Sequence, residues 1–153
     1  MPAVLIPDLA ALKDLVGKDV AVTDWVEISQ ARIDRFAEAT EDRQWIHVDP
    51  ARAAAESPFG STIAHGFLTL SLLPHFLALA LRMEGVRMGV NYGLNRIRFT
   101  APVPVGSRLR AGFTLAAVED IAGGAQTTWS VAIEREGSDK PVCVAEWLTR
   151  RYA

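Results

Sequence analysis

An acid and an imidazole, Asp42 and His47, lie five residues apart in the polar stretch TEDRQWIHVD. A carboxylate and a neutral imidazole that point into one small volume can hold a water molecule and accept its proton, which is general acid–base catalysis. The same residues also have a structural interpretation, in which Asp42 caps a turn and His47 is a half-buried, hydrogen-bonded histidine. Considered by spacing alone, the pair favours the structural interpretation.

A second candidate, His65-Gly66, stands where a turn-rich loop meets a long apolar segment. The first N–H groups of a helix have no partner inside the helix and carry partial positive charge. A glycine there lets a carbonyl oxygen approach closely, so Gly66 could stabilise an oxyanion. The alternative is a glycine needed only for close packing of the loop against the helix. His75, beside Pro74 in the apolar segment, is expected to have a structural role.

Helical patterns surround these candidates and must position them. Residues 9–16 predict a short helix, Ser29 is a suitable N-cap for the next one, and Asp49-Pro50 can start a short helix over residues 51–56. The longest predicted helix follows Gly66 and runs to about Met83. It is apolar almost all round, so other elements must enclose it. Pro74 within it predicts a kink.

Strand patterns with a period of two make up most of the remaining chain. One strand is predicted over residues 20–28, and four more follow Gly85 and are joined by short turns. A change of parity near Asn95-Arg96 predicts a β-bulge. Consecutive strands joined by short turns pair antiparallel. We therefore expect an α+β fold, in which a five-stranded antiparallel sheet curls around the apolar helix.

Composition restricts the possible functions. The 153 residues include 16 Lys and Arg against 18 Asp and Glu, a net charge of −2, which is not typical of a nucleic-acid-binding protein. A single cysteine, Cys143, excludes an internal disulfide and a cysteine-rich zinc site, and no metal is expected. The longest apolar stretch is too short to span a membrane. The prediction is one domain over residues 1–153, located in the cytoplasm.

Three stretches of this sequence resemble a known family. Residues 33–49 (IDRFAEATEDRQWIHVD), followed by TIAHG, are similar to the MaoC-like dehydratase and (R)-specific enoyl-CoA hydratase family, and most of all to its NodN-like branch. Residues 91–107 (NYGLNRIRFTAPVPVGS) resemble the strand and turn that follow in that family. The resemblance extends from Trp25 to Arg151. It implies a hot-dog fold, a homodimer, and reversible hydration of a trans-2-enoyl-CoA to an (R)-3-hydroxyacyl-CoA.

The resemblance also implies roles for individual residues. Asp42 and His47 would bind and activate the water, and the Gly66 N–H would donate a hydrogen bond to the thioester oxygen. No separate cofactor is implied, because coenzyme A is part of the substrate. The candidate substrate-binding residues are Gln44, His65, Asn91, Gly93, Arg96 and Arg98.

Two features of these substrate-binding candidates have alternatives. Arg96 and Arg98 alternate with apolar residues and so leave one sheet face, where they would meet coenzyme A phosphates or simply face solvent. Many relatives have glycine where this chain has Glu41, and asparagine-proline where it has Gln44-Trp45. These departures affect the shape of the pocket but leave the acid–histidine pair in place.

Two other functions are compatible with the same residues. An Asp–His pair beside an oxyanion site could direct water at the thioester carbonyl, which would make the chain an acyl-CoA thioesterase. A catalytically inactive acyl-CoA-binding hot-dog subunit is the second alternative.

Overall fold

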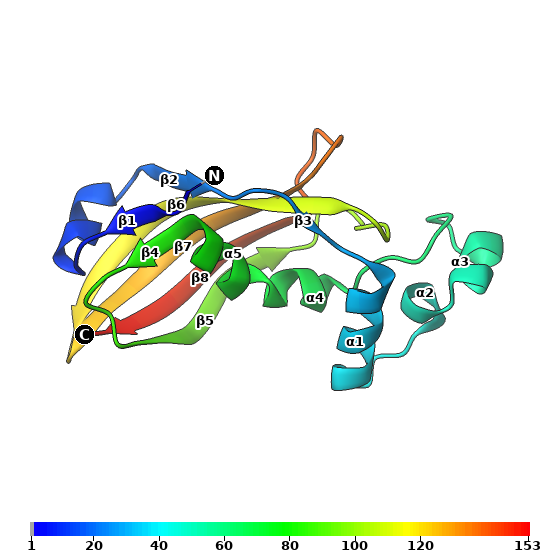
Figure 1. Ribbon diagram of the computed structural model, residues 1–153, viewed down its shortest axis with the longest axis horizontal. Coiled ribbons are helices and arrows are strands. Elements are labelled where there is room, and N and C mark those ends of the chain that lie inside the picture. Colours follow the sequence, from blue (N-terminus) through cyan, green and yellow to red (C-terminus); the bar gives the residue numbers. More distant parts are fainter. Residues whose placement is uncertain (1) are drawn as a thin grey trace.

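A curved antiparallel sheet packs against one side of two consecutive helices in the computed structural model, which describes residues 2–153 (Figure 1). Hydrogen-bonded neighbours in the sheet follow the order β2-β6-β7-β8-β5, and β3 pairs separately with β6. Its strands are β2 (Asp19–Val22), β3 (Val26–Glu27), β5 (Met88–Arg98), β6 (Arg108–Ile121), β7 (Gly124–Arg135) and β8 (Cys143–Tyr152). The expected α+β architecture is confirmed, with six strands in this sheet where five were predicted.

The extra strand arises because the predicted strand over residues 20–28 is interrupted at Thr23. The Thr23 N–H donates to the Ala111 carbonyl at 2.9 Å, and the Thr23 hydroxyl accepts from the Ala111 N–H at 3.0 Å. The side chain thus replaces a backbone partner, and β2 and β3 form separately on either side of this point.

The helices fall into two groups. The first group, beyond one end of the sheet, consists of α1 (Gln30–Thr40), α2 (Trp45–Val48) and α3 (Pro50–Glu56) (Figure 1). The second consists of α4 (Gly66–Ser71) and α5 (Leu73–Ala80), which pack on the sheet with one side and expose the other, so the expected enclosure on all sides is not observed. A short 3-10 helix, Ala10–Leu15, replaces the predicted helix over residues 9–16. None of the helices in residues 2–153 is long and apolar enough to cross a membrane.

The long predicted helix differs from the observed one at two places. It is divided at Leu72, and Pro74 lies in the first turn of α5, so the predicted kink is a break between two helices. Its predicted end at Met83 is wrong, because α5 ends at Ala80 and β4 (Leu81–Met83) follows. β4 pairs in parallel with β1 (Val4–Ile6), so hydrogen bonding to the N-terminal segment takes over this part of the chain.

The edge strand β5 is irregular and exposed. Its register with β8 shifts between Asn91 and Gly93 and again between Leu94 and Arg96. The second shift confirms the predicted bulge. Four of its apolar side chains are more than one-third exposed, namely Met88, Val90, Tyr92 and Leu94.

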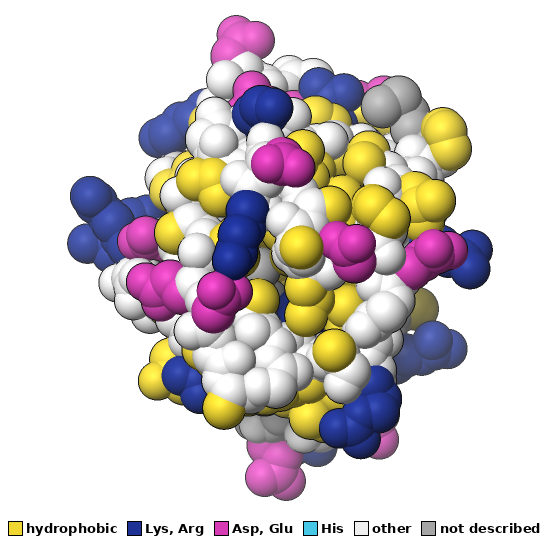
Figure 2. All heavy atoms as spheres, turned by 90° about the vertical axis from the view of Figure 1, so that its left-hand side faces the viewer, with side chains coloured by type: hydrophobic (Ala, Val, Ile, Leu, Met, Phe, Trp, Pro, Cys, Tyr) yellow, Lys and Arg dark blue, Asp and Glu magenta, His cyan; other side chains and the backbone are white. Residues whose placement is uncertain are grey.

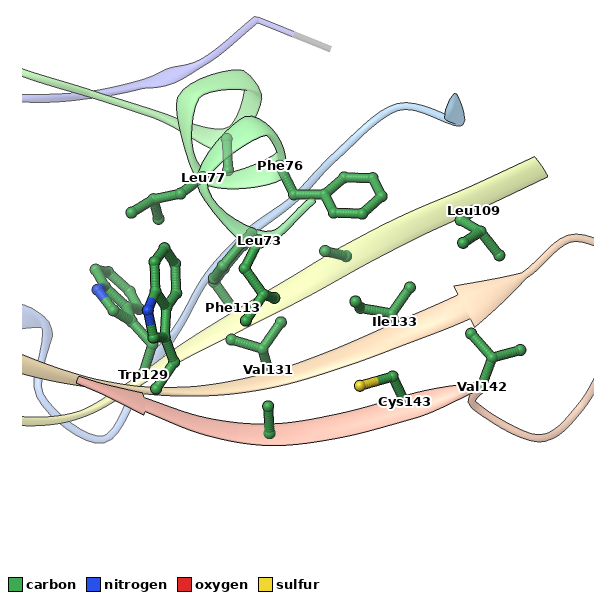
Figure 3. Packing of buried hydrophobic residues seen from close by; sticks show 14 of the residues in the cluster. Leu73, Phe76, Leu77, Leu109, Phe113, Trp129, Val131, Ile133, Val142 and Cys143 are labelled. Atoms are coloured by element: carbon green, nitrogen blue, oxygen red, sulfur yellow. The ribbon is translucent and has the colours of Figure 1, made fainter. Parts of the chain in front are cut away.

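The core lies between α5 and the concave face of the sheet (Figure 3). Leu73, Phe76 and Leu77 of α5 are buried there together with side chains from β6, β7 and β8. The Phe113 and Trp129 rings meet edge to face, with centroids 5.9 Å apart. Cys143 is fully buried in the same cluster. This core fixes α4 and α5, and therefore also fixes Gly66 at the start of α4.

Candidate active site

The loop that carries Asp42 begins where α1 ends. The Ser29 hydroxyl caps α1 by accepting from the Arg32 N–H, as predicted. Glu41 ends the helix in the left-handed conformation, with φ of 64°, which favours glycine. This backbone conformation explains why glycine is suitable at the position of Glu41. It also reverses the chain, so that Asp42 turns back toward the N-terminus of α4.

Asp42 both stabilises a turn and belongs to the site. Its Oδ1 accepts a long hydrogen bond of 3.4 Å from the Gln44 N–H, which is the turn-capping role considered as an alternative. The carboxylate is half-buried. Ligand atoms of Asp42, His47 and His65 all lie within 4.8 Å of one another. The structural and chemical interpretations of Asp42 are therefore compatible.

The His47 ring is held in one tautomer. Its Nδ1 lies 2.7 Å from the Ile63 carbonyl oxygen, and because a carbonyl only accepts, Nδ1 carries the proton. Nε2 then has a free lone pair. Burial lowers the pKa of His47, and the neighbouring His65 lowers it further, against the opposing effects of the Ile63 hydrogen bond and of Asp42. The ring is thus a neutral base at neutral pH.

His65 positions the other two residues. Its Nε2 donates to the Asp42 backbone carbonyl at 2.9 Å. Its ring stacks on His47, with centroids 3.8 Å apart and planes 22° from parallel. The sequence predicted His65 as a substrate-binding residue. In the structure it joins the Asp42 loop to the His47 ring.

The same three side chains could by type hold a metal ion, but their geometry is unsuitable. A ring nitrogen binds a metal in the plane of its ring, and the planes of two stacked rings do not converge on one point. The hydrogen bond from one nitrogen of each ring to a backbone carbonyl leaves the other nitrogen, Nε2 of His47 and Nδ1 of His65, available to a water molecule. The arrangement is better suited to a water molecule than to a cation.

Gly66 lies close to this pair because the preceding loop connects them. The Ile63 carbonyl that fixes His47 is three residues before Gly66, and the Ala64 N–H binds the Val103 carbonyl at 2.8 Å. Within residues 2–153 the Gly66 N–H has no hydrogen-bond partner. A Cβ at Gly66 would lie 3.0 Å from the Phe99 ring. The N–H is thus available to a ligand, as an oxyanion site requires.

A cavity of about 380 Å³ has both Gly66 and Phe99 in its wall. Thr69 also lines it, and the hydroxyl of this buried residue has no partner within the described part of the chain. No sequence pattern indicates Thr69, because a threonine one turn into an apolar helix is common. Its unpaired hydroxyl makes it an additional candidate for contact with the substrate.

Gln30 is a further residue of the site that no sequence pattern indicates. Its Nε2 donates to the His47 backbone carbonyl at 2.8 Å, and its Oε1 accepts from the Thr62 hydroxyl at 2.6 Å. It therefore ties α1 to α2 and to the loop before Gly66. No local pattern indicates such a role, because its partners are 17 and 32 residues away.

Of the remaining predicted substrate-binding residues, Gln44 adjoins the pair and the others lie on β5. Gln44 is exposed at the start of α2, and its backbone N–H donates to the Asp42 carboxylate. Asn91 and Gly93 line a different cavity, of about 310 Å³, between β5 and the helices. Arg96 and Arg98 do share one sheet face, but they pair with Glu146 and Val144, on the face turned away from α4 and α5.

Sequence comparison identifies relatives over nearly the full length. The family described as MaoC like domain matches residues 12–135. The 3-hydroxyacyl-thioester dehydratase Z of Mycobacterium tuberculosis is 54% identical over 149 residues, covering 97% of this chain and 96% of that protein. Nodulation protein N of Rhizobium leguminosarum bv. viciae is 44% identical over 149 residues, covering 92% of this chain and 89% of that protein.

Solved structures show the same fold. The (R)-hydratase from A. caviae involved in PHA biosynthesis has a TM-score of 0.68 and 26% identity, covering 88% of this chain and 94% of that one. The monoamine oxidase regulatory protein from Archaeoglobus fulgius has a TM-score of 0.77 over 100% of this chain and 99% of that one, and at 19% identity it supports the fold alone. The expected hot-dog fold is confirmed, and this chain belongs to the MaoC-like dehydratase family.

Proposed function

We propose that this chain is an (R)-specific enoyl-thioester hydratase, which adds water reversibly across the double bond of a trans-2-enoyl-CoA. The observation that carries the proposal is the fixed tautomer of His47, which leaves Nε2 with a free lone pair in a ring that shares one cluster of 4.8 Å with Asp42 and with His65, the residue directly before Gly66. The names of the relatives, a 3-hydroxyacyl-thioester dehydratase and an (R)-hydratase, support the same reaction.

The proposed mechanism assigns one task to each group. Asp42 acts as general base toward a water molecule that His47 orients, and the water oxygen bonds to C3 of the enoyl group. Negative charge develops on the thioester oxygen, where the Gly66 N–H donates a hydrogen bond worth roughly 3–4 kcal/mol. Asp42 passes the proton taken from the water to the free Nε2 of His47, and His47 delivers it to C2, so that both groups return to their starting protonation states. Positioned acid–base groups of this kind contribute about 10²–10⁴-fold to the rate.

Product analysis on crotonyl-CoA tests this function against the two alternatives. We expect the ultraviolet absorbance of the conjugated enoyl thioester to fall while no free thiol appears. Release of free thiol would instead identify a thioesterase, in which the same pair directs water at the carbonyl. If neither signal changed, a non-catalytic acyl-CoA-binding subunit would be favoured.

The stereochemistry of the product is tested with the same reaction. Because the water and the thioester oxygen are both held by fixed groups, only one face of the enoyl group is exposed to attack. The similarity to an (R)-hydratase indicates which face is attacked, so we expect the (R)-3-hydroxyacyl-CoA. Coupling to an (S)-specific 3-hydroxyacyl-CoA dehydrogenase should then form no NADH. Rapid NADH formation would show that the stereochemical assignment is wrong.

We also propose that the chain forms a homodimer through β5. This edge strand has unpaired backbone groups and exposed apolar side chains, a combination that proteins usually cover. Light scattering at micromolar concentration should report about twice the chain mass of 16.7 kDa.

Val90→Lys on β5 should shift the population toward monomer. Val22→Lys is the matched control, because Val22 is equally exposed, at 43%, on the opposite edge strand β2.

A solution mass that matched a single chain for the unmodified protein would contradict the dimer. Equal dissociation by both lysine variants would contradict the assignment of the interface to β5.

A further inference from the structure

β8 ends with two adjacent arginines that differ in their surroundings. Arg150 lies over the Tyr92 ring at 3.7 Å, and its Nε donates to Gln126 at 3.0 Å. Arg151 points to the other sheet face, since neighbouring residues of a strand alternate. Its side chain has no hydrogen bond or ion pair with any residue in 2–153, and its Nε is buried. Arg151 is therefore a largely buried cation without a counter-ion among residues 2–153.

Gly89 provides the space that Arg151 occupies. The two residues are paired across β5 and β8. A Cβ at Gly89 would lie 2.1 Å from Nη1 of Arg151, so the guanidinium lies directly over this glycine. The absence of a side chain at Gly89 thus lets the guanidinium extend across the edge strand, toward the outside of the sheet.

The guanidinium faces a cavity of about 410 Å³ between α5, β4 and β5. Pro74, Leu77 and Trp147 form part of its apolar wall. This cavity lies toward the end of the molecule at which the chain terminates, on the left of Figure 1. Figure 2 views that end and shows apolar side chains mixed with charged ones. The site thus combines an apolar wall with an unpaired cation.

The cavity at Arg151 continues toward Gly66. It shares Pro74, Asn91 and Trp147 with the cavity of about 310 Å³ beside β5. Leu70 lines that second cavity, and its chain neighbour Thr69 lines the Gly66 cavity. The three cavities, here called the helix groove, therefore follow one another along α4 and α5. Arg98, next to Phe99 at the Gly66 end, pairs with Val144 of β8, and Arg151 is seven residues further along that strand. The rise of a β-strand over seven residues gives the helix groove a length of roughly 23 Å.

We propose that Arg151 binds an anionic group of the thioester substrate at the far end of the helix groove. The inference rests on the proposed function, because it assumes that the thioester lies at Gly66. A guanidinium donates two parallel hydrogen bonds to a carboxylate or phosphate, and such an anion compensates a buried positive charge. Burial lowers the pKa of Arg151, but a guanidinium stays protonated at neutral pH.

Two parts of the substrate carry such an anion. One is a phosphate of coenzyme A, at the end of the pantetheine arm, and the other is a carboxylate at the far end of a long acyl chain. Both arms are flexible chains that can follow a groove. The chemistry recognised by Arg151 is the same in the two cases, so ligands that differ in one anion at a time separate them.

Equilibrium binding to saturated thioesters, which cannot be hydrated, tests the proposal by calorimetry. The ligands are butyryl-CoA, butyryl-pantetheine without phosphates, and a pair of long-chain acyl-CoAs that end in a methyl or a carboxylate group. The variants are Arg151→Met, Arg151→Lys and Gly89→Ala, whose Cβ would displace the guanidinium. Arg150→Met is the matched control, because Arg150 is adjacent and has its partners on the other face.

We expect Arg151→Met and Gly89→Ala to weaken binding of the ligands that carry the recognised anion by about 10- to 100-fold. Arg151→Lys should retain part of the affinity, and Arg150→Met should retain all of it. A loss of affinity for butyryl-CoA but not for butyryl-pantetheine would identify a coenzyme A phosphate as the anion that Arg151 binds. A loss of affinity only for the acyl-CoA that ends in a carboxylate would identify the end of the acyl chain as the bound anion.

Other results would overturn the proposal. Equal loss for all ligands, including butyryl-pantetheine, would mean that Arg151 is only structural. Unchanged affinities accompanied by dissociation of the dimer would mean that a carboxylate of the second copy is its partner. If both the affinities and the solution mass were unchanged, the binding of a substrate anion by Arg151 would also be excluded. Because these measurements need no turnover, a protein that binds thioesters through Arg151 but does not hydrate crotonyl-CoA would refute only the proposed function.

Discussion

Asp42→Asn and His47→Ala are each expected to slow the hydration of crotonyl-CoA at least about 10²-fold, with the fold intact. Asparagine keeps an oxygen for the Gln44 N–H but has no negative charge, so the turn is preserved while the base is lost. The His47 variant removes the lone pair at Nε2. Initial rates measure the effect, and circular dichroism with thermal unfolding confirms that each variant is folded.

His75→Ala is the control for these two variants. His75 is an exposed imidazole on α5, where the sequence predicted a structural role, and its loss should leave turnover nearly unchanged. A folded Asp42→Asn or His47→Ala variant with close to unmodified turnover would show that the site is misassigned.

Gly66→Val is expected to reduce turnover by about 10²- to 10³-fold, comparable to the loss of one oxyanion hydrogen bond. The backbone N–H remains, but a Cβ at this position meets the Phe99 ring at 3.0 Å, and the branched side chain extends into the space that the thioester oxygen needs. The measurement is kcat and kcat/KM on crotonyl-CoA, together with a thermal unfolding curve.

Ser71→Ala provides the comparison within the same helix. The Ser71 hydroxyl is exposed and donates to the Phe67 carbonyl of its own helix at 2.6 Å. Turnover should therefore change little. If Gly66→Val kept turnover within a few-fold of the unmodified protein, the oxyanion role of Gly66 would be wrong.

The elements that local patterns specify were predicted well, and those that distant partners specify were not. Ser29 and Pro74 mark a helix start and a helix break through their own chemistry, and both predictions are confirmed. The end of α5 depends instead on β1, whose residues pair with β4 from more than seventy positions away. No pattern near Leu81 could indicate that pairing.

The same distinction between local patterns and distant partners applies to the candidate site. The spacing of Asp42 and His47, together with the family resemblance, located the acid and the base. The tautomer of His47 depends on the Ile63 carbonyl and the orientation of its ring on His65, which only the folded chain brings together. For Arg96 and Arg98 the alternation predicted one shared face correctly, but only pairing with β8 decides which face that is.

The buried position of Cys143 has a practical consequence for distinguishing a hydratase from a thioesterase. Burial in the core raises the pKa of this thiol to about 11, and thiol-specific reagents react with exposed thiolates. It is the only cysteine in the sequence. While the protein is folded, a colorimetric thiol reagent therefore detects released coenzyme A without a background signal from the enzyme, even at high enzyme concentration.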